Sequence, residues 1–190
     1  MTLSGFEFTA SIHESSQAIV QRGIRLRDQR AVVVKSVAVR DDTAVYRCRH
    51  QFELTSTLSM RGVIHTLELL QTTSHLHLVM DDAGTRNLRD VITAGQIPIV
   101  DVLVFAEGLA SSLETLHAHH IIHRDLNPTN IIVGDEAPTI AIADLGLAVR
   151  LSPAAPYLVT ESMEGTLSYM APEQTGRVRR PIDVRSDLYA

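Results

Sequence analysis

The chain has 190 residues, of which 45% are hydrophobic, and a formal net charge of −5, so it can bury a hydrophobic core but is about one domain long. The acidic balance leaves no basic footprint for nucleic acid, and the single cysteine, Cys48, excludes an intramolecular disulfide framework and fits a reducing cytoplasm. Residues 1–14 lack the features of a secretion signal and no apolar stretch approaches the roughly 20 residues that span a bilayer, so we expect a soluble, cytoplasmic protein without membrane insertion.

The first half of the chain has two strand-like segments on either side of a helical one. Ala31–Lys35 is short and β-branched, which predicts a strand, and Leu76–Met80 has the same character. Residues 42–58 carry polar and apolar positions in a mixed helical pattern. Asp81–Gly84 interrupts the second strand and is the candidate hinge between two lobes.

The second half begins with a long helix and continues with a strand pair. After Pro98, apolar residues recur at steps of three and four, which places them on one face of a helix: Val102, Phe105, Ala106, Leu109, Leu113 and Leu116. Ile131–Val133 and Thr139–Ile142 predict two strands joined across residues 134–138, a geometry that would bring Asp144 back towards Asn130. Strands early and helices late predict an α+β fold.

Three short motifs follow one another in the second half. They are the segment His123–Asn130, then Asp144-Leu145-Gly146, and then Ala171-Pro172-Glu173. Taken singly, an aspartate in a turn or a cap is the commoner explanation for each. Phosphoryl transfer, however, needs oxygen ligands for Mg²⁺ and a polar group beside the acceptor, and Asp125, Asn130 and Asp144 supply such groups.

In this order the motifs resemble the catalytic loop, the metal-binding tripeptide and the end of the activation segment of eukaryotic-type serine/threonine protein kinases. The resemblance implies a bilobal fold with a small β-rich N-lobe (1–80), a hinge (81–84) and a partial helical C-lobe (85–190) that lacks the later helices. It implies transfer of a phosphoryl group from ATP, with Mg²⁺, to a Ser/Thr hydroxyl of a protein substrate in signalling. The implied catalytic residues are Asp125, Lys35 and Asn130, of which Asp125 would accept the proton of the substrate hydroxyl or orient that hydroxyl. The implied metal ligands are Asn130 and Asp144. The implied ATP-binding residues are Lys35, Val20, Ala83 and Asp144.

The resemblance is closer still to one group of kinases. Asn127 replaces the usual lysine, and residues 164–177 continue directly into 182–189, as in the N-terminal kinase domain of large multidomain proteins that also carry an AAA-type ATPase region and a sensor histidine kinase. This implies further signalling domains in a longer chain. It also implies that Asp187 binds the backbone of the catalytic loop, and that the isolated 190 residues are poorly stable and inactive.

The nucleotide-binding half departs from the kinase pattern. His13, Ser15 and Ala18 stand at the three positions that are usually glycine, and Gln51 replaces the helical glutamate that pairs with Lys35. A Lys35–Gln51 contact would be weaker than a charged one. A pseudokinase without turnover is therefore the alternative function. A small-molecule phosphotransferase is opposed by Ala171-Pro172-Glu173, which is typical of kinases with protein substrates.

The resemblance also assigns the activation segment. An arginine before the catalytic aspartate, here Arg124, marks kinases whose activation segment can be ordered by a phosphate. Thr160 and Ser162 are the regulatory candidates, and Thr166 resembles the threonine that contacts the catalytic aspartate. The crowded histidines lack acidic or Cys partners at ligand spacing, which argues against a metal site; they are His117, His119, His120 and His123, the last being a structural residue of the catalytic loop.

Overall fold

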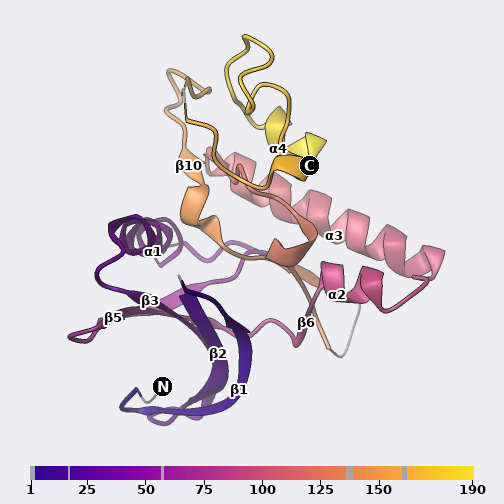
Figure 1. Cartoon of the computed structure of the whole chain (residues 1–190). Coiled ribbons are helices and arrows are strands. Elements are labelled where there is room, and N and C mark those ends of the chain that lie inside the picture. The colour runs from indigo at the N-terminus through magenta and orange to yellow at the C-terminus, as the bar shows by residue number, and fades with distance from the viewer. Residues whose placement is uncertain (1–2, 17, 57, 136–138, 160–161) are drawn as a thin grey trace. The chain divides into compact units, whose positions relative to one another are not determined.

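The computed structural model describes residues 3–16, 18–56, 58–135, 139–159 and 162–190. The chain divides into two compact units (Figure 1). Unit 1 comprises Met1–Ser59 and Ile64–Asp82, and unit 2 comprises Met60–Val63 and Ala83–Ala190. The last change of unit, between Asp82 and Ala83, thus falls inside the segment 81–84 that we expect to be a hinge, while residues 60–63 pack with unit 2.

Unit 1 is built on an antiparallel sheet of five strands in the order β1-β2-β3-β5-β4. The strands are β1 (Phe6–Glu14), β2 (Ala18–Arg25), β3 (Arg30–Ala38), β4 (Thr66–Gln71) and β5 (His75–Asp81). The two strands that we predicted from the sequence are therefore confirmed as β3 and β5, which pair in the middle of the sheet. Figure 1 shows that β1 and β2 curve strongly together.

The two faces of this sheet are buried in different ways. Val32, Val34 and Val79 are fully buried on one face, because successive side chains of a strand point to opposite sides. Helix α1 (Asp42–Thr55) packs on β3, β4 and β5, as the helical pattern of residues 42–58 predicts. Asp41 begins this helix: its carboxylate accepts a hydrogen bond from the amide of Ala44 at 3.0 Å, which satisfies one of the unpaired amides of the first turn.

A histidine in the core of unit 1 makes stability depend on pH. His77 is 1% exposed and lies 2.8 Å from the Ser36 hydroxyl through Nδ1. Burial, and to a smaller extent the neighbouring His75, hold the pKa of His77 below its ordinary value. The unfolded chain therefore binds a proton first as pH falls through about 6.5, so the free energy of unfolding is unaffected above this pH and decreases below it, by up to about 1.4 kcal/mol per pH unit.

We expect this decrease in urea denaturation curves measured between about pH 5 and 7.5. His77→Gln should flatten the pH dependence, whereas His13→Gln, which changes an exposed histidine of β1, should leave it unchanged. Equal slopes for the wild type and His77→Gln would contradict the assignment.

Unit 2 combines helices with two small sheets. Its helices are α2 (Leu88–Thr93), α3 (Ile99–Ala118) and α4 (Arg185–Tyr189). One sheet has the order β6-β8-β9 and the other pairs β10 with β7; the strands are β6 (Arg86–Asn87), β7 (Ile121–Ile122), β8 (Ile131–Val133), β9 (Ile140–Ile142) and β10 (Val149–Arg150). The predicted pair is confirmed as β8 and β9, with Ile131 opposite Ile142.

Helix α3 is the long helix predicted after Pro98, but only part of it is buried. Leu113 and Leu116 are buried near its C-terminal end, whereas Val102 is 40% exposed and Leu103 is 63% exposed. Among the described residues no helix is long and apolar enough to cross a membrane.

Candidate active site

The loop 123–130 leads from β7 to the short 3₁₀ helix η1 (Pro128–Asn130) and β8. Arg124 has a φ of +69°, in the left-handed region that residues other than glycine rarely adopt. The Asp187 carboxylate accepts hydrogen bonds from the amides of His123 and Arg124, both at 2.9 Å. This confirms the predicted contact between Asp187 and the loop backbone, and it fixes the direction in which the chain enters Asp125.

His123 holds the loop from the inside. It is fully buried, and its Nε2 donates to the carbonyl oxygen of Ala143 at 3.0 Å. Since a carbonyl oxygen only accepts, the proton sits on Nε2, and Nδ1 is left to accept the amide of Asp125 at 3.3 Å. The predicted structural role of His123 is confirmed.

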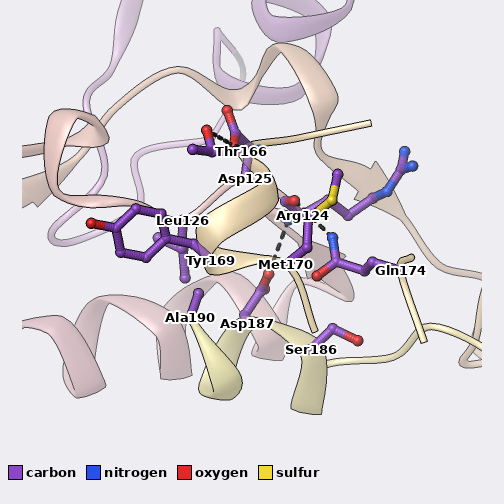
Figure 2. A pocket seen from close by; sticks show the side chains of 10 residues that line it. All are labelled: Arg124, Asp125, Leu126, Thr166, Tyr169, Met170, Gln174, Ser186, Asp187 and Ala190. Carbon is purple, nitrogen blue, oxygen red and sulfur yellow. Dashed lines mark hydrogen bonds between the residues drawn. The ribbon is translucent and has the colours of Figure 1, made fainter. Parts of the chain in front are cut away.

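The Asp125 carboxylate is held by side chains from three directions. Its Oδ1 accepts from the amide and the hydroxyl of Thr166, both at 2.7 Å (Figure 2). The side-chain amide of Asn127 lies 3.3 Å from the same oxygen, and that of Asn130 lies 3.3 Å from Oδ2. The predicted contact with Thr166 is confirmed. Because Asp125 is half-buried and Thr166 is exposed, an incoming group can approach this carboxylate.

Asn130 and Asp144 are brought together by the β8–β9 hairpin. The amide of Ala143 donates to the carbonyl oxygen of Asn130 at 2.8 Å, which places Asp144 next to Asn130 as predicted. The Asn130 side chain donates through Nδ2 to the backbone oxygen of Asp125 at 2.9 Å and to its Oδ2, so its Oδ1 is the atom left to face a cation. A carboxylate and an amide oxygen fit Mg²⁺, which takes a few protein oxygens and keeps several waters.

Asn127 is a functional candidate that the predicted site omits. It is 6% exposed, its Nδ2 donates to Thr166 Oγ1 at 3.2 Å, and its Oδ1 accepts from the amide of Thr129 at 3.0 Å. Asn127 thus connects the loop 123–130 with the segment that contains Thr166. The signal in the sequence was the departure from lysine at this position.

Arg124 points its side chain towards the segment that follows Asp144. Its guanidinium NH2 lies 3.5 Å from Glu164 Oε2, and NH1 donates to the carbonyl oxygen of Leu147 at 3.3 Å. Of the two regulatory candidates, Ser162 is exposed, and Thr160 lies outside the described residues.

The remaining predicted residues lie in unit 1 or at its boundary. Val20 stands directly opposite Lys35 in the β2–β3 pair, and Ala83 begins the second part of unit 2. Gln51 is 1% exposed and donates to the sulfur of Met80 at 3.5 Å, while its Oε1 has no hydrogen-bond partner among the described residues. A lysine ammonium only donates, so Lys35 could bond Gln51 only through Oε1, and the structure shows no such Lys35–Gln51 hydrogen bond among the described residues.

The turn between β1 and β2 is closed by serine rather than by glycine. The Ser15 amide donates to the carbonyl oxygen of Ala18 at 3.0 Å, and the Ser15 hydroxyl accepts from the Ala18 amide at 3.2 Å. Pairing of the two strands extends to Glu14 and Ile19. Hydrogen bonds between Ser15 and Ala18 therefore close this end of the β1–β2 pair, where the glycine-rich pattern is missing.

Comparisons with known proteins point in one direction. A family model described as "Protein kinase domain" matches residues 6–190. Serine/threonine-protein kinase pkn2 of Myxococcus xanthus is 32% identical over 148 residues, which are 76% of this chain and 18% of that protein. Serine/threonine-protein kinase ULK3 of Mus musculus is 30% identical over 193 residues, which are 99% of this chain and 40% of that protein. Serine/threonine-protein kinase 36 of Pongo abelii is 29% identical, and the chain spans only 13% of its length.

Proposed function

Because the chain belongs to the protein kinase domain family, we propose that the protein transfers a phosphoryl group from ATP to serine or threonine hydroxyls of another protein. The observation that supports this proposal most strongly is the position of the Asp125 carboxylate. It accepts two hydrogen bonds of 2.7 Å from Thr166, and Asp125 is only half-buried, so the carboxylate is partly accessible to an acceptor. A carboxylate held in this way has a fixed position from which it can orient an incoming hydroxyl.

Each proposed residue has a distinct role. Asp125 accepts the hydrogen bond of the acceptor hydroxyl and takes its proton. Asp144 and Asn130 are the proposed metal ligands, and the proposed nucleotide-binding residues are Lys35, which stands opposite Val20 in the β2–β3 pair, Val20 itself and Ala83. When bound, Mg²⁺ supplies charge neutralisation for the phosphate oxygens of ATP.

The competing hypothesis is that the protein is a pseudokinase, and a phosphotransfer assay tests it directly. The unpartnered Oε1 of Gln51 and the serine-closed β1–β2 turn favour it. Phosphotransfer from radiolabelled ATP to a generic protein acceptor, measured beside nucleotide binding and beside Asp144→Ala, separates the two. We expect transfer by the full-length wild-type protein and none by the full-length variant. Nucleotide binding with equal background transfer from both proteins would overturn the kinase assignment.

We expect Gln51→Glu to tighten ATP binding or raise turnover several-fold. A carboxylate at this position could accept a charge-assisted hydrogen bond from Lys35 that the Gln51 amide does not make, and a hydrogen bond to a charged group is worth about 1.5–3 kcal/mol against about 1 for a neutral one. Isothermal titration with ATP and steady-state kinetics measure the effect. Glu53→Gln is the matched control, since Glu53 is exposed on the same helix. No change in either quantity would mean that a carboxylate at position 51 does not reach Lys35.

The cellular setting is part of the same proposal. A cytoplasmic location is proposed because the reaction consumes ATP, and the curated relatives are longer than this chain, which spans 13 to 40% of those compared. This favours a kinase domain joined to further signalling domains. Ser162, exposed near the Arg124–Glu164 pair, is the proposed phosphorylation site of the activation segment.

A further inference from the structure

The strained residue before Asp125 is held at both ends of its backbone. Arg124 adopts a left-handed conformation, and a residue other than glycine stays there only when its surroundings fix it. Asp187 binds the Arg124 amide at 2.9 Å. The Arg124 carbonyl oxygen, which belongs to the same peptide group as the amide of Asp125, is bound from the other side by Gln174.

Gln174 uses both halves of its side-chain amide. It is 6% exposed, its Nε2 donates to the Arg124 oxygen at 2.8 Å, and its Oε1 accepts from the amide of Ala171 at 3.0 Å. Figure 2 shows Gln174 and Asp187 on the opposite side of Arg124 from Thr166. Only a side chain that donates and accepts at this length can join the loop 123–130 to the end of the activation segment in this way.

The same carbonyl oxygen is also restricted by Gly165. A Cβ atom on Gly165 would come within 2.9 Å of the Arg124 oxygen, so this oxygen lies close to the backbone of residue 165 as well as to Gln174. Rotation of the peptide group between Arg124 and Asp125 would break the Gln174 bond and press the oxygen on its surroundings. The direction of this peptide group sets where the Asp125 side chain leaves the backbone.

We propose that Gln174 is a positioning residue for phosphoryl transfer: by holding the Arg124 carbonyl oxygen, it keeps the Asp125 carboxylate where Thr166 and the acceptor hydroxyl meet it. The proposal deepens the kinase function proposed above and rests on it. Gln174 follows the Ala171-Pro172-Glu173 motif directly, is 6% exposed and uses both halves of its amide on backbone groups, so its effect passes through Asp125.

Two variants distinguish positioning of the Asp125 carboxylate by Gln174 from stabilisation of the turn in which Gln174 lies. Gln174→Met has a similar length but cannot donate to the Arg124 oxygen. Thr175→Val is the matched control, because it removes a 2.8 Å hydrogen bond from Thr175 Oγ1 to the oxygen of Pro172 in the same turn without touching the loop 123–130. Both proteins are compared with the wild type after thermal denaturation has confirmed that each is folded at the assay temperature.

For Gln174→Met we expect kcat to fall by about 10- to 100-fold with the affinity for ATP unchanged, since a small misplacement of a catalytic group has effects of this size. Thr175→Val should keep kcat within about twofold. In an Asp125→Asn background Gln174→Met should have no further effect on the residual rate, because the group through which it acts is gone. A kcat like that of the wild type, or an equal loss in the Asp125→Asn background, would overturn the proposal.

An NMR measurement that does not depend on catalytic activity tests the role of Gln174 separately from the kinase assignment. The amide nitrogen chemical shift of Asp125 reports the hydrogen bond to the Arg124 oxygen, because both atoms belong to one peptide group. We expect Gln174→Met to move this resonance and Thr175→Val to leave it in place. If the wild type transfers no phosphate, the kinase function fails while the Asp125 resonance still decides whether Gln174 holds the peptide. An unmoved resonance would refute the positioning role.

Discussion

Asp125→Asn is expected to lower kcat for phosphotransfer by about a hundred- to ten-thousandfold, the range that general acid–base catalysis supplies. Asparagine keeps the size of the side chain and an oxygen that can accept from Thr166, but it cannot take a proton from the acceptor hydroxyl. Since Asp125 is not a proposed nucleotide or metal ligand, the affinity for ATP should change little. Steady-state kinetics and a nucleotide titration in the absence of acceptor measure the two quantities.

Asp144→Asn provides the contrasting variant. It removes the carboxylate that we assign to the metal, so we expect it to lose phosphotransfer and Mg²⁺-dependent nucleotide binding together. The roles are wrong if Asp125→Asn weakens nucleotide binding as much as Asp144→Asn does. Transfer by the wild type no greater than by either variant would favour the pseudokinase.

Asp187→Ala is expected to cause the largest loss of stability in unit 2. Asp187 is 4% exposed, and its carboxylate accepts from the amides of His123 and Arg124 and from Nε2 of His117, all at 2.9 Å. Alanine would leave these donors without a partner, and each buried unsatisfied group costs about 1–3 kcal/mol. We therefore expect a loss of about 3–5 kcal/mol, a large part of the 5–15 kcal/mol that a domain typically has.

Urea denaturation measures this loss in the free energy of unfolding, and two further variants serve as controls. Asp187→Asn keeps one acceptor oxygen and should lose less stability than alanine. Asp183→Asn changes a neighbouring aspartate whose partner, Arg185, is 72% exposed, and surface ion pairs of this kind contribute little. A loss for Asp187→Ala no greater than that for Asp183→Asn would show that the loop does not depend on the buried carboxylate.

Local residue patterns were enough for the elements with strong periodicity. β-Branched runs located β3 and β5, and apolar steps of three and four located α3. Strand β1 was not predicted, although Phe6, Phe8, Ala10 and Ile12 alternate with polar residues along it. Its side chains are mostly exposed, and a half-exposed strand gives a weaker signal than a buried one.

The chemistry of the site could also be assigned in part from residue order. The resemblance to protein kinases implied the contacts of Asp125 with Thr166 and of Asp187 with the loop backbone, and both are present. The hydrogen bond considered between Lys35 and Gln51 is absent, because spacing along a helix places Gln51 on a face but does not decide which neighbour on that face its side chain meets.

The sequence alone determined the family, the order of the motifs and the identities of the proposed catalytic groups, because these depend on residue types at short spacings. Only the tertiary structure decided what holds Arg124 in its left-handed conformation. Asp187 and Gln174 are separated from Arg124 by 63 and 50 residues, and each contact joins a side chain to a backbone atom. Such bonds follow no period along the chain, and they form only when the fold brings a buried polar side chain to a backbone group that has no other partner.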